Sequence, residues 1–295
     1  MNGFVDLHTH STWSDGTLSP SELVKEARLA GLSAIALTDH DVLDGIPEAR
    51  EAGTAEGIEV IAGVEISARC RYGEVHMLGI EVDAGDGSLL RQALTRQCLA
   101  RKERLPRLLE KLGALGMPVE IDEVMDIAGQ GSIGRPHVAE VMVRKGFVPN
   151  VEQAFTRFLR EGGPAYVGRE TVSAEEAVAL IHGAGGFAAI AHPGLIRTGD
   201  FAALEVFVRE LAATGLDGLE CFTNAHDSGS MAACTGIARR AGLIPTGGSD
   251  FHGDKKPGVR LGWTRGGGRF PYAILSDVRN RLAQARPGGR ASAET

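Results

Sequence analysis

The chain has 295 residues, of which 43% are hydrophobic and 23% are charged, and these values exclude a chain that is disordered throughout. The net charge of −7 argues against a broad basic face for nucleic acid, so a phosphate group must be held by a local positive site. The sequence contains neither a long apolar run nor a secretory leader pattern. We therefore expect no membrane span and a cytoplasmic location.

The first third of the chain alternates short apolar runs with helical patterns. Strands are predicted over residues 3–7 and 34–37, and the helix between them begins at a capping box formed by Ser19 and Glu22. Two further strands are predicted over 59–66 and 75–82. This alternation indicates an α/β fold with a mainly parallel sheet.

A different pattern occupies the middle of the chain. Strand candidates nearly vanish there, and helices are predicted over 88–112, 120–128, 136–145 and 150–160. The alternation then resumes with a helix over 173–183 and strands over 187–191, 218–222 and 243–247. The sequence thus predicts an α/β core that carries a helical insertion.

Histidines and carboxylates lie at the ends of most predicted strands. The candidates are His8, His10, Asp15, His40, Glu65, His76, His192, Asp250 and His252. Catalytic groups of parallel α/β barrels gather at the carboxyl ends of the strands, so these side chains are expected to converge. Imidazoles and carboxylates without a thiolate suit Zn²⁺, Mn²⁺ or Fe²⁺. Nine ligands are too many for one ion, and about three per ion is a common arrangement in catalytic sites.

Five segments together resemble the PHP (polymerase and histidinol phosphatase) phosphoesterase family. They are His8 to Gly16, Thr38 to Asp41, Gly63 to Ser67, His192-Pro193 and Gly248 to His252. The resemblance implies a distorted (β/α)₇ barrel, for which we expect residues 1–98 and 166–295, with an inserted α-helical domain over 99–165 as a substrate lid. It also implies a multinuclear centre of two to three divalent ions, with Mn²⁺ preferred and Zn²⁺ or Fe²⁺ as alternatives.

The resemblance implies a division of the ligands among three ions. His8, His10, Glu65 and Asp250 would bind the first, Glu65, His76 and His192 the second, and Asp15, His40 and His252 the third. Three ions bring more positive charge than three carboxylates remove, and this surplus favours phosphate as the substrate group. The expected nucleophile is a metal-activated hydroxide, so no protein nucleophile is required.

Two further segments narrow the resemblance to one subgroup of the PHP family. Gly134-Arg135-Pro136-His137 and the stretch from Glu220 to His226 resemble segments of nucleoside 3′,5′-bisphosphate phosphatases and the related 5′-to-3′ exoribonucleases. The expected activity is removal of the 3′-phosphate from a nucleoside 3′,5′-bisphosphate, with short RNA as a secondary substrate and no obligate protein partner. Expected substrate contacts are Arg135, His137, Asn224 and His226. Arg135 at a helix N-terminus suits a second phosphate, although Arg135, His137 and His226 could also be ordinary surface residues.

Other functions remain open at this point. One alternative is a histidinol phosphate phosphatase, against which the helical insertion and the Gly-Arg-Pro-His segment argue. Another is a PHP phosphodiesterase that acts on other small phosphoesters. A polymerase-associated module is disfavoured because no polymerase domain is attached, and a non-phosphate amidohydrolase is disfavoured because no lysine is placed to form a carbamylated ligand.

Overall fold

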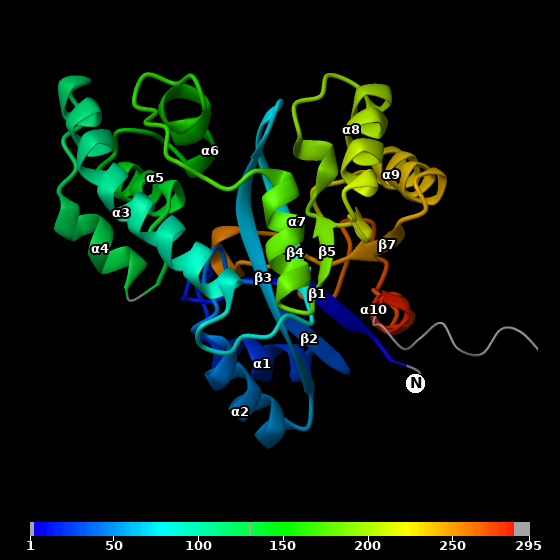
Figure 1. Cartoon of the computed structure of the whole chain (residues 1–295). Helices are drawn as coiled ribbons and strands as arrows, with labels where there is room; N and C mark the ends of the chain where they lie inside the picture. Colours follow the sequence, from blue (N-terminus) through cyan, green and yellow to red (C-terminus); the bar gives the residue numbers. More distant parts are fainter. Residues whose placement is uncertain (1–2, 130, 286–295) are drawn as a thin grey trace, which may run out of the picture.

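The computed structural model describes residues 3–129 and 131–285. Within these ranges seven strands form one curled sheet, and their order in the sheet is their order in the chain. The strands are β1 (Val5–Thr9), β2 (Ala34–Leu37), β3 (Glu59–Cys70), β4 (Gly73–Ile80), β5 (Phe187–Ile190), β6 (Gly218–Phe222) and β7 (Ile244–Gly247). They lie at the centre of the molecule with helices around them (Figure 1).

The six helices predicted from the sequence are present, and the described residues form four further α-helices that were not predicted, over 46–56, 201–213, 228–240 and 273–285. In the described part of the chain the α-helices are α1 (Pro20–Leu29), α2 (Ile46–Glu56), α3 (Leu89–Ala114), α4 (Ile121–Ala128), α5 (Arg135–Arg144), α6 (Val151–Ala154), α7 (Ala174–Gly183), α8 (Phe201–Ala213), α9 (Ser228–Arg240) and α10 (Ala273–Ala285). A π-helical turn over Phe155–Leu159 continues α6. Ser19 and Glu22 form the predicted capping box of α1, in which each side chain binds the other residue's backbone N–H.

The direction of β4 explains how the sheet gathers its polar residues. The pairs β1–β2, β2–β3, β5–β6 and β6–β7 are parallel, whereas β4 is antiparallel to both of its neighbours. The first residues of β4 therefore lie at the sheet edge where the neighbouring strands end. For this reason His76, near the start of β4, pairs with Ser67 in the second half of β3.

The two outer strands approach each other and bring the sheet close to a barrel. The backbone N–H of Asp250 donates to the carbonyl of His8 at 2.9 Å, and the N–H of His10 donates to the carbonyl of Phe251 at 3.0 Å. These bonds join the end of β1 to the segment after β7. The mainly parallel α/β sheet and the distorted barrel with its inserted helices are thereby confirmed.

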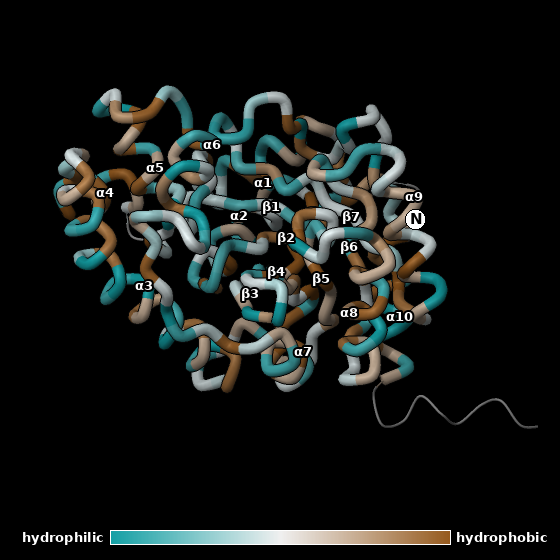
Figure 2. The backbone as a smooth tube through the Cα atoms, turned by 90° about the horizontal axis from the view of Figure 1, so that it is seen from above, coloured by the Kyte–Doolittle hydropathy of each residue, from teal (hydrophilic) through white to brown (hydrophobic). Residues whose placement is uncertain are grey.

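The helices between β4 and β5 have a hydrophobic core of their own. Buried apolar side chains from Leu105 to Ala165 pack together in one cluster, separate from the clusters of the barrel. Helices α3, α4, α5 and α6 lie together to one side of the sheet (Figure 1 and Figure 2). Leu90 and Leu94, however, belong to the barrel core. Helix α3 thus runs without a break across the predicted boundary at residue 99.

Two smaller expectations concern membranes and thiols. Among the helices in the described ranges, none has both the length and the apolar character to cross a bilayer. The four cysteines are free, and Cys221 and Cys234 are buried in the barrel core.

Candidate active site

All nine predicted metal ligands converge at one edge of the sheet. They form four overlapping groups, and within each group the candidate ligand atoms lie within 4.8 Å of one another. The groups are His10, Asp15, His40 and His252; His8, His10 and Asp250; His8, Glu65 and His192; and His40, Glu65 and His76. Residues separated by more than 240 positions in the sequence are thus neighbours, because successive strands end at the same edge.

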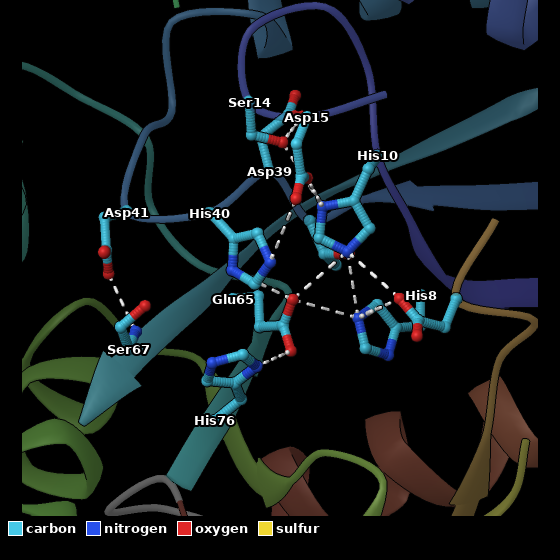
Figure 3. A network of polar contacts seen from close by, with 12 residues as sticks. His8, His10, Ser14, Asp15, Asp39, His40, Asp41, Glu65, Ser67 and His76 are labelled. Atoms are coloured by element: carbon cyan, nitrogen blue, oxygen red, sulfur yellow. Dashed lines mark hydrogen bonds and ion pairs between the residues drawn. The ribbon is translucent and has the colours of Figure 1, made fainter. Parts of the chain in front are cut away.

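Glu65 is the centre of this cluster. Its side chain is 1% exposed and is approached by five imidazoles. Figure 3 shows four of these rings turned toward its carboxylate. Oε2 lies 3.2 Å from His8 Nε2 and 3.1 Å from both His10 Nε2 and His40 Nδ1, while Oε1 lies 2.9 Å from His76 Nδ1 and 3.0 Å from His192 Nε2.

In spite of these short distances, several ligand atoms are buried and form no hydrogen bond of acceptable geometry in the described part of the chain. They are Asp15 Oδ1, His40 Nδ1, Glu65 Oε2 and His76 Nδ1. A buried polar atom that lacks a partner costs about 1–3 kcal/mol, so four such atoms around one point require an explanation. Divalent cations bound among them would supply the missing partner. The residues present therefore fit a metal centre built from nitrogen and oxygen donors.

The electrostatics differ from one candidate ligand to the next. Against the effect of burial, neighbouring carboxylates raise the pKa of His10 to about 9 and that of His76 to about 10, whereas the pKa values of Glu65 and His40 are lowered. Burial opposes ionisation of Glu65, but His40, His76 and His8 hold the pKa of its carboxyl well below the usual value. Burial lowers the pKa of His40 to about 3, against the opposing effects of Glu65 and Asp15. Glu65 is therefore an anion near neutral pH, and His40 is an uncharged imidazole with a free lone pair.

Strained backbone also gathers around the cluster. Asp41, His192 and Asp250 have φ values of 56°, 29° and 57°, in the left-handed region that non-glycine residues rarely occupy. Such conformations cost about 1–3 kcal/mol each and persist where surrounding contacts fix them, often at functional sites.

A cavity of about 130 Å³ opens beside the metal ligands. Asp15, His40 and His76 contribute to its lining, together with four arginines: Arg101, Arg104, Arg135 and Arg169. An anionic group in this cavity would therefore meet guanidinium groups and the candidate metal centre at the same time.

Three of the four arginines are paired with carboxylates. The buried carboxylate of Asp41 accepts from Arg101 Nε at 3.0 Å and lies 3.5 Å from an Arg169 nitrogen. Arg135 donates to both carboxylate oxygens of Glu74, at 2.7 and 2.8 Å. These ion pairs hold the arginines around the cavity.

Arg104 differs from its neighbours. It is 5% exposed, and it forms neither a hydrogen bond nor an ion pair within the described ranges. Burial, together with the charges of Arg135, Arg101 and Arg169, lowers the pKa of its guanidinium to about 9. A buried cation without a counter-ion is costly unless an anion joins it. Arg104 therefore offers a cation that is unpaired among the described residues to any anionic group in this cavity.

Sequence reasoning named Arg135 but missed Arg101, Arg104 and Arg169. Arg101 and Arg104 are three positions apart on α3 and so share one helix face. This spacing could have identified them as a pair of neighbouring cations. Arg169 lies in the segment after the inserted helices and carried no signal of its own.

The four predicted substrate contacts lie in different surroundings. Arg135 and His137 line the cavity. His137 is 1% exposed, its Nδ1 accepts the N–H of Gly134 at 3.1 Å, and burial and Lys255 lower its pKa to about 4. It is therefore neutral near pH 7 and fixes the start of α5.

Asn224 and His226 do not contribute to the lining of this cavity. Asn224 donates to the carbonyls of Ser249 and Trp263, at 3.0 and 2.8 Å. His226 is 1% exposed, and backbone groups occupy both ring nitrogens: the carbonyl of Cys221 at Nδ1 and the N–H of Gly194 at Nε2, each at 3.0 Å. These contacts tie loops together, and a role of Asn224 or His226 in substrate binding stays a prediction.

Comparison with known proteins agrees with the sequence resemblance. Residues 6–118 match the family described as "PHP domain". The chain is 34% identical over 261 residues to a 3′,5′-nucleoside bisphosphate phosphatase of Chromobacterium violaceum, covering 88% of this chain and 91% of the relative. It is 36% identical over 253 residues to a 5′-3′ exoribonuclease of Haemophilus influenzae, covering 85% and 91%.

A solved structure extends the likeness to three dimensions. A protein from Bifidobacterium adolescentis, described as a metal-dependent phosphoesterase, superposes with a TM-score of 0.83 at 31% identity, covering 94% of this chain and 96% of the other. The nine converging ligands, the curled seven-stranded sheet and these full-length similarities agree with one another. The chain therefore belongs to the PHP domain family.

Proposed function

We propose that this protein is a metal-dependent phosphatase that removes the 3′-phosphate from nucleoside 3′,5′-bisphosphates, with short RNA trimmed from its 5′ end as a secondary substrate. The observation that carries the proposal is one cavity whose lining includes both candidate metal ligands and four arginines. Two adjacent anion sites suit a substrate with two phosphates. The similarity to a bisphosphate phosphatase and to an exoribonuclease supports the same substrate class.

The nine clustered residues would hold two to three divalent ions, with Mn²⁺ preferred. When bound, such ions supply Lewis acidity toward phosphate oxygens and lower the pKa of coordinated water. The chain itself binds and orients the substrate. A terminal 5′-phosphate is a dianion near neutral pH, and guanidinium groups hold such a group through charge-assisted hydrogen bonds. Anchoring the 5′ end in this way directs the 3′ ester toward the metal ligands.

Among the arginines, we assign the main anchoring role to Arg104. The guanidinium group of Arg135 already donates to Glu74 and would have to leave this carboxylate to bind a phosphate. Among the described residues Arg104 has no carboxylate partner that a phosphate would have to displace. A bound phosphate would therefore interact with an unpaired guanidinium group. Arg135 and Arg169 then add positive charge at the sides of the cavity.

The inserted helices would serve as the substrate lid. Arg101, Arg104 and Arg135 come from α3 and α5, whereas every candidate metal ligand lies outside residues 99–165. We propose that residues 1–98 and 166–295 form the metal-binding barrel and that residues 99–165 supply recognition of the substrate.

The test compares two substrates in one variant. Arg104→Met should lower kcat/KM for adenosine 3′,5′-bisphosphate by about 30- to 1000-fold, as expected for loss of about 2–4 kcal/mol of buried phosphate contact. Hydrolysis of p-nitrophenyl phosphate, which has no second phosphate, should change little. Arg107→Met is the matched control, because Arg107 lies on the same helix one position beyond Pro106 and is exposed.

Product analysis supplies the second half of the test. Phosphorus NMR should show AMP and inorganic phosphate from adenosine 3′,5′-bisphosphate. Formation of 3′-AMP would reverse the proposed orientation, and equal losses on both substrates would remove the anchoring role of Arg104. Faster turnover of histidinol phosphate or of a phosphodiester than of the bisphosphate would replace the proposed substrate.

A further inference from the structure

Glu220 on β6 is a fully buried carboxylate outside the set of nine candidate ligands. Each of its oxygens binds a different part of the metal cluster. Oε1 lies 2.9 Å from Nδ1 of His8, and Oε2 accepts the backbone N–H of His192 at 2.7 Å. One side chain thus connects the end of β1 with the turn that follows β5.

The contact with His8 determines which ring nitrogen faces the cluster. When Nδ1–H donates to Glu220, Nε2 keeps its lone pair. That nitrogen points toward Glu65 Oε2 at 3.2 Å and Asp250 Oδ1 at 3.5 Å. A carboxylate behind a ligating imidazole fixes both the tautomer and the rotation of the ring.

The contact with His192 fixes a strained residue. With a φ of 29°, His192 would relax if its backbone were released. Held as it is, its Nε2 lies 3.0 Å from Glu65 Oε1. The rings of His8 and His192 are stacked with centroids 5.8 Å apart, so Glu220 also sets the spacing between these two imidazoles.

We infer that Glu220 is a positioning residue that presents Nε2 of His8 and Nε2 of His192 to a common metal ion and thereby sets the affinity of that site. The inference rests on the proposed metal centre and is independent of which phosphoester is the substrate. Glu220 itself binds no ion in this arrangement, because both of its oxygens are engaged by His8 and His192.

The same strand offers a matched control. Asp217, immediately before β6, also joins an imidazole to a backbone N–H: its Oδ2 lies 2.8 Å from His182 Nε2 and accepts the N–H of Ala188 at 3.0 Å. Asp217 precedes the first residue of β6, whereas Glu220 is the middle residue of this five-residue strand, and Asp217 belongs to none of the candidate metal-ligand groups of the described residues. Asp217→Asn therefore disturbs an equivalent set of contacts without touching the metal cluster.

The experiment measures metal binding. Wild type, Glu220→Gln and Asp217→Asn are stripped of metal and titrated with Mn²⁺, and free Mn²⁺ is followed by electron paramagnetic resonance. Glu220→Gln should weaken one Mn²⁺ site by about 10- to 100-fold, whereas Asp217→Asn should bind as the wild type does. Wild-type binding by Glu220→Gln, or equal weakening in both variants, would overturn the inference. If the protein did not hydrolyse the bisphosphate, the proposed substrate would be wrong, but the difference in Mn²⁺ binding between the variants would still stand.

A measurement on the wild type covers the case in which Glu220→Gln does not fold. Long-range proton–nitrogen NMR of Zn²⁺-loaded protein with ¹⁵N-labelled histidine should show His8 protonated at Nδ1, with Nε2 bound to metal. Protonation at Nε2 would contradict the role of Glu220. The spectrum reports directly which ring nitrogen of His8 carries the proton. A contact elsewhere that only stabilises the fold would not change this readout.

Discussion

The two ends of the sheet both carry histidine–carboxylate contacts, but in the described part of the chain these contacts differ in how fully their atoms are hydrogen-bonded. At the metal-ligand end, four buried ligand atoms lack hydrogen-bond partners within the described residues. At the opposite end, His182 binds Asp217 at 2.8 Å. Protein interiors normally satisfy their buried polar groups, so the contrast separates a site built to receive a ligand from one built to hold the fold.

A second cluster of mutually bonded polar groups lies at the end of the sheet that carries His182 and Asp217, which we call the structural end. Arg279 on α10 donates from Nε to Glu81 Oε1 at 2.8 Å and from a terminal nitrogen to the Tyr272 hydroxyl at 3.0 Å. The Tyr272 hydroxyl donates in turn to Glu59 Oε2 at 2.7 Å. These bonds fasten α10 to β3 and to the end of β4.

The largest effect is expected at the centre of the metal-ligand end. Glu65→Gln removes the carboxylate that five imidazoles approach, and turnover should fall by at least about 10³-fold, or about 4 kcal/mol in transition-state stabilisation. Metal content per chain, measured by elemental analysis, should fall with it. Glu81→Gln makes the same chemical change at the structural end and should preserve both quantities. Wild-type metal content in Glu65→Gln would contradict the proposed centre.

Metal removal should also affect stability. An ion that is held only by the folded state and is present at 100 times its Kd contributes about 2.7 kcal/mol. Stripping the protein with a chelator should therefore abolish turnover and lower Tm by several degrees, and added Mn²⁺ should restore both. Calorimetry before and after metal addition measures the shift. An unchanged Tm and full activity after verified removal would refute a resident metal.

Disruption of the cluster around Arg279 should lower stability without affecting turnover or metal content. Arg279→Met leaves Glu59 and Glu81 without their cation and should lower the free energy of unfolding by about 1 kcal/mol, because all three side chains are about one third exposed. Turnover of the folded protein and its metal content should stay at the wild-type level. Urea denaturation provides the stability measurement. A loss of metal in this variant would show that the two ends are coupled.

The smallest effect concerns pH. The hydrogen bond to Asp217 raises the pKa of His182 above its usual value, against partial burial. This contribution is fully present below the unfolded pKa of about 6.5 and is lost as pH rises through the higher folded pKa. Because the side chain is 40% exposed, it amounts to less than about 1 kcal/mol. The Tm difference between wild type and His182→Gln should shrink from about pH 6 to about pH 9, and a difference that grows would contradict the assignment.

The metal cluster was predictable because strand ends are readable in the sequence. Residues that follow apolar runs meet at one sheet edge whatever separates them in the chain, and His8, His40 and His192 needed no more than that. His76 was harder to place, because nothing in its segment shows that β4 runs antiparallel to its neighbours.

The substrate side was less predictable because it depends on packing. Arg104 faces the cavity because the inserted helices fold against the barrel, and its spacing from Arg101 indicates a shared helix face but not what that face contacts. The substrate role predicted for His226 stays a prediction, because a histidine after a strand can bind either a ligand or backbone. Here its ring fits against Gly194, where a Cβ atom would lie 2.8 Å from Nε2.

The arrangement of the chain has an evolutionary consequence. The candidate metal ligands all lie in the barrel segments, while Arg101, Arg104 and Arg135 lie in a segment with a hydrophobic core of its own. Mutations in the inserted helices can therefore accumulate without altering the groups that perform the chemistry. We expect relatives to diverge in substrate choice mainly through residues 99–165, and an exchange of this segment between two relatives offers a direct route to a phosphatase with redesigned selectivity.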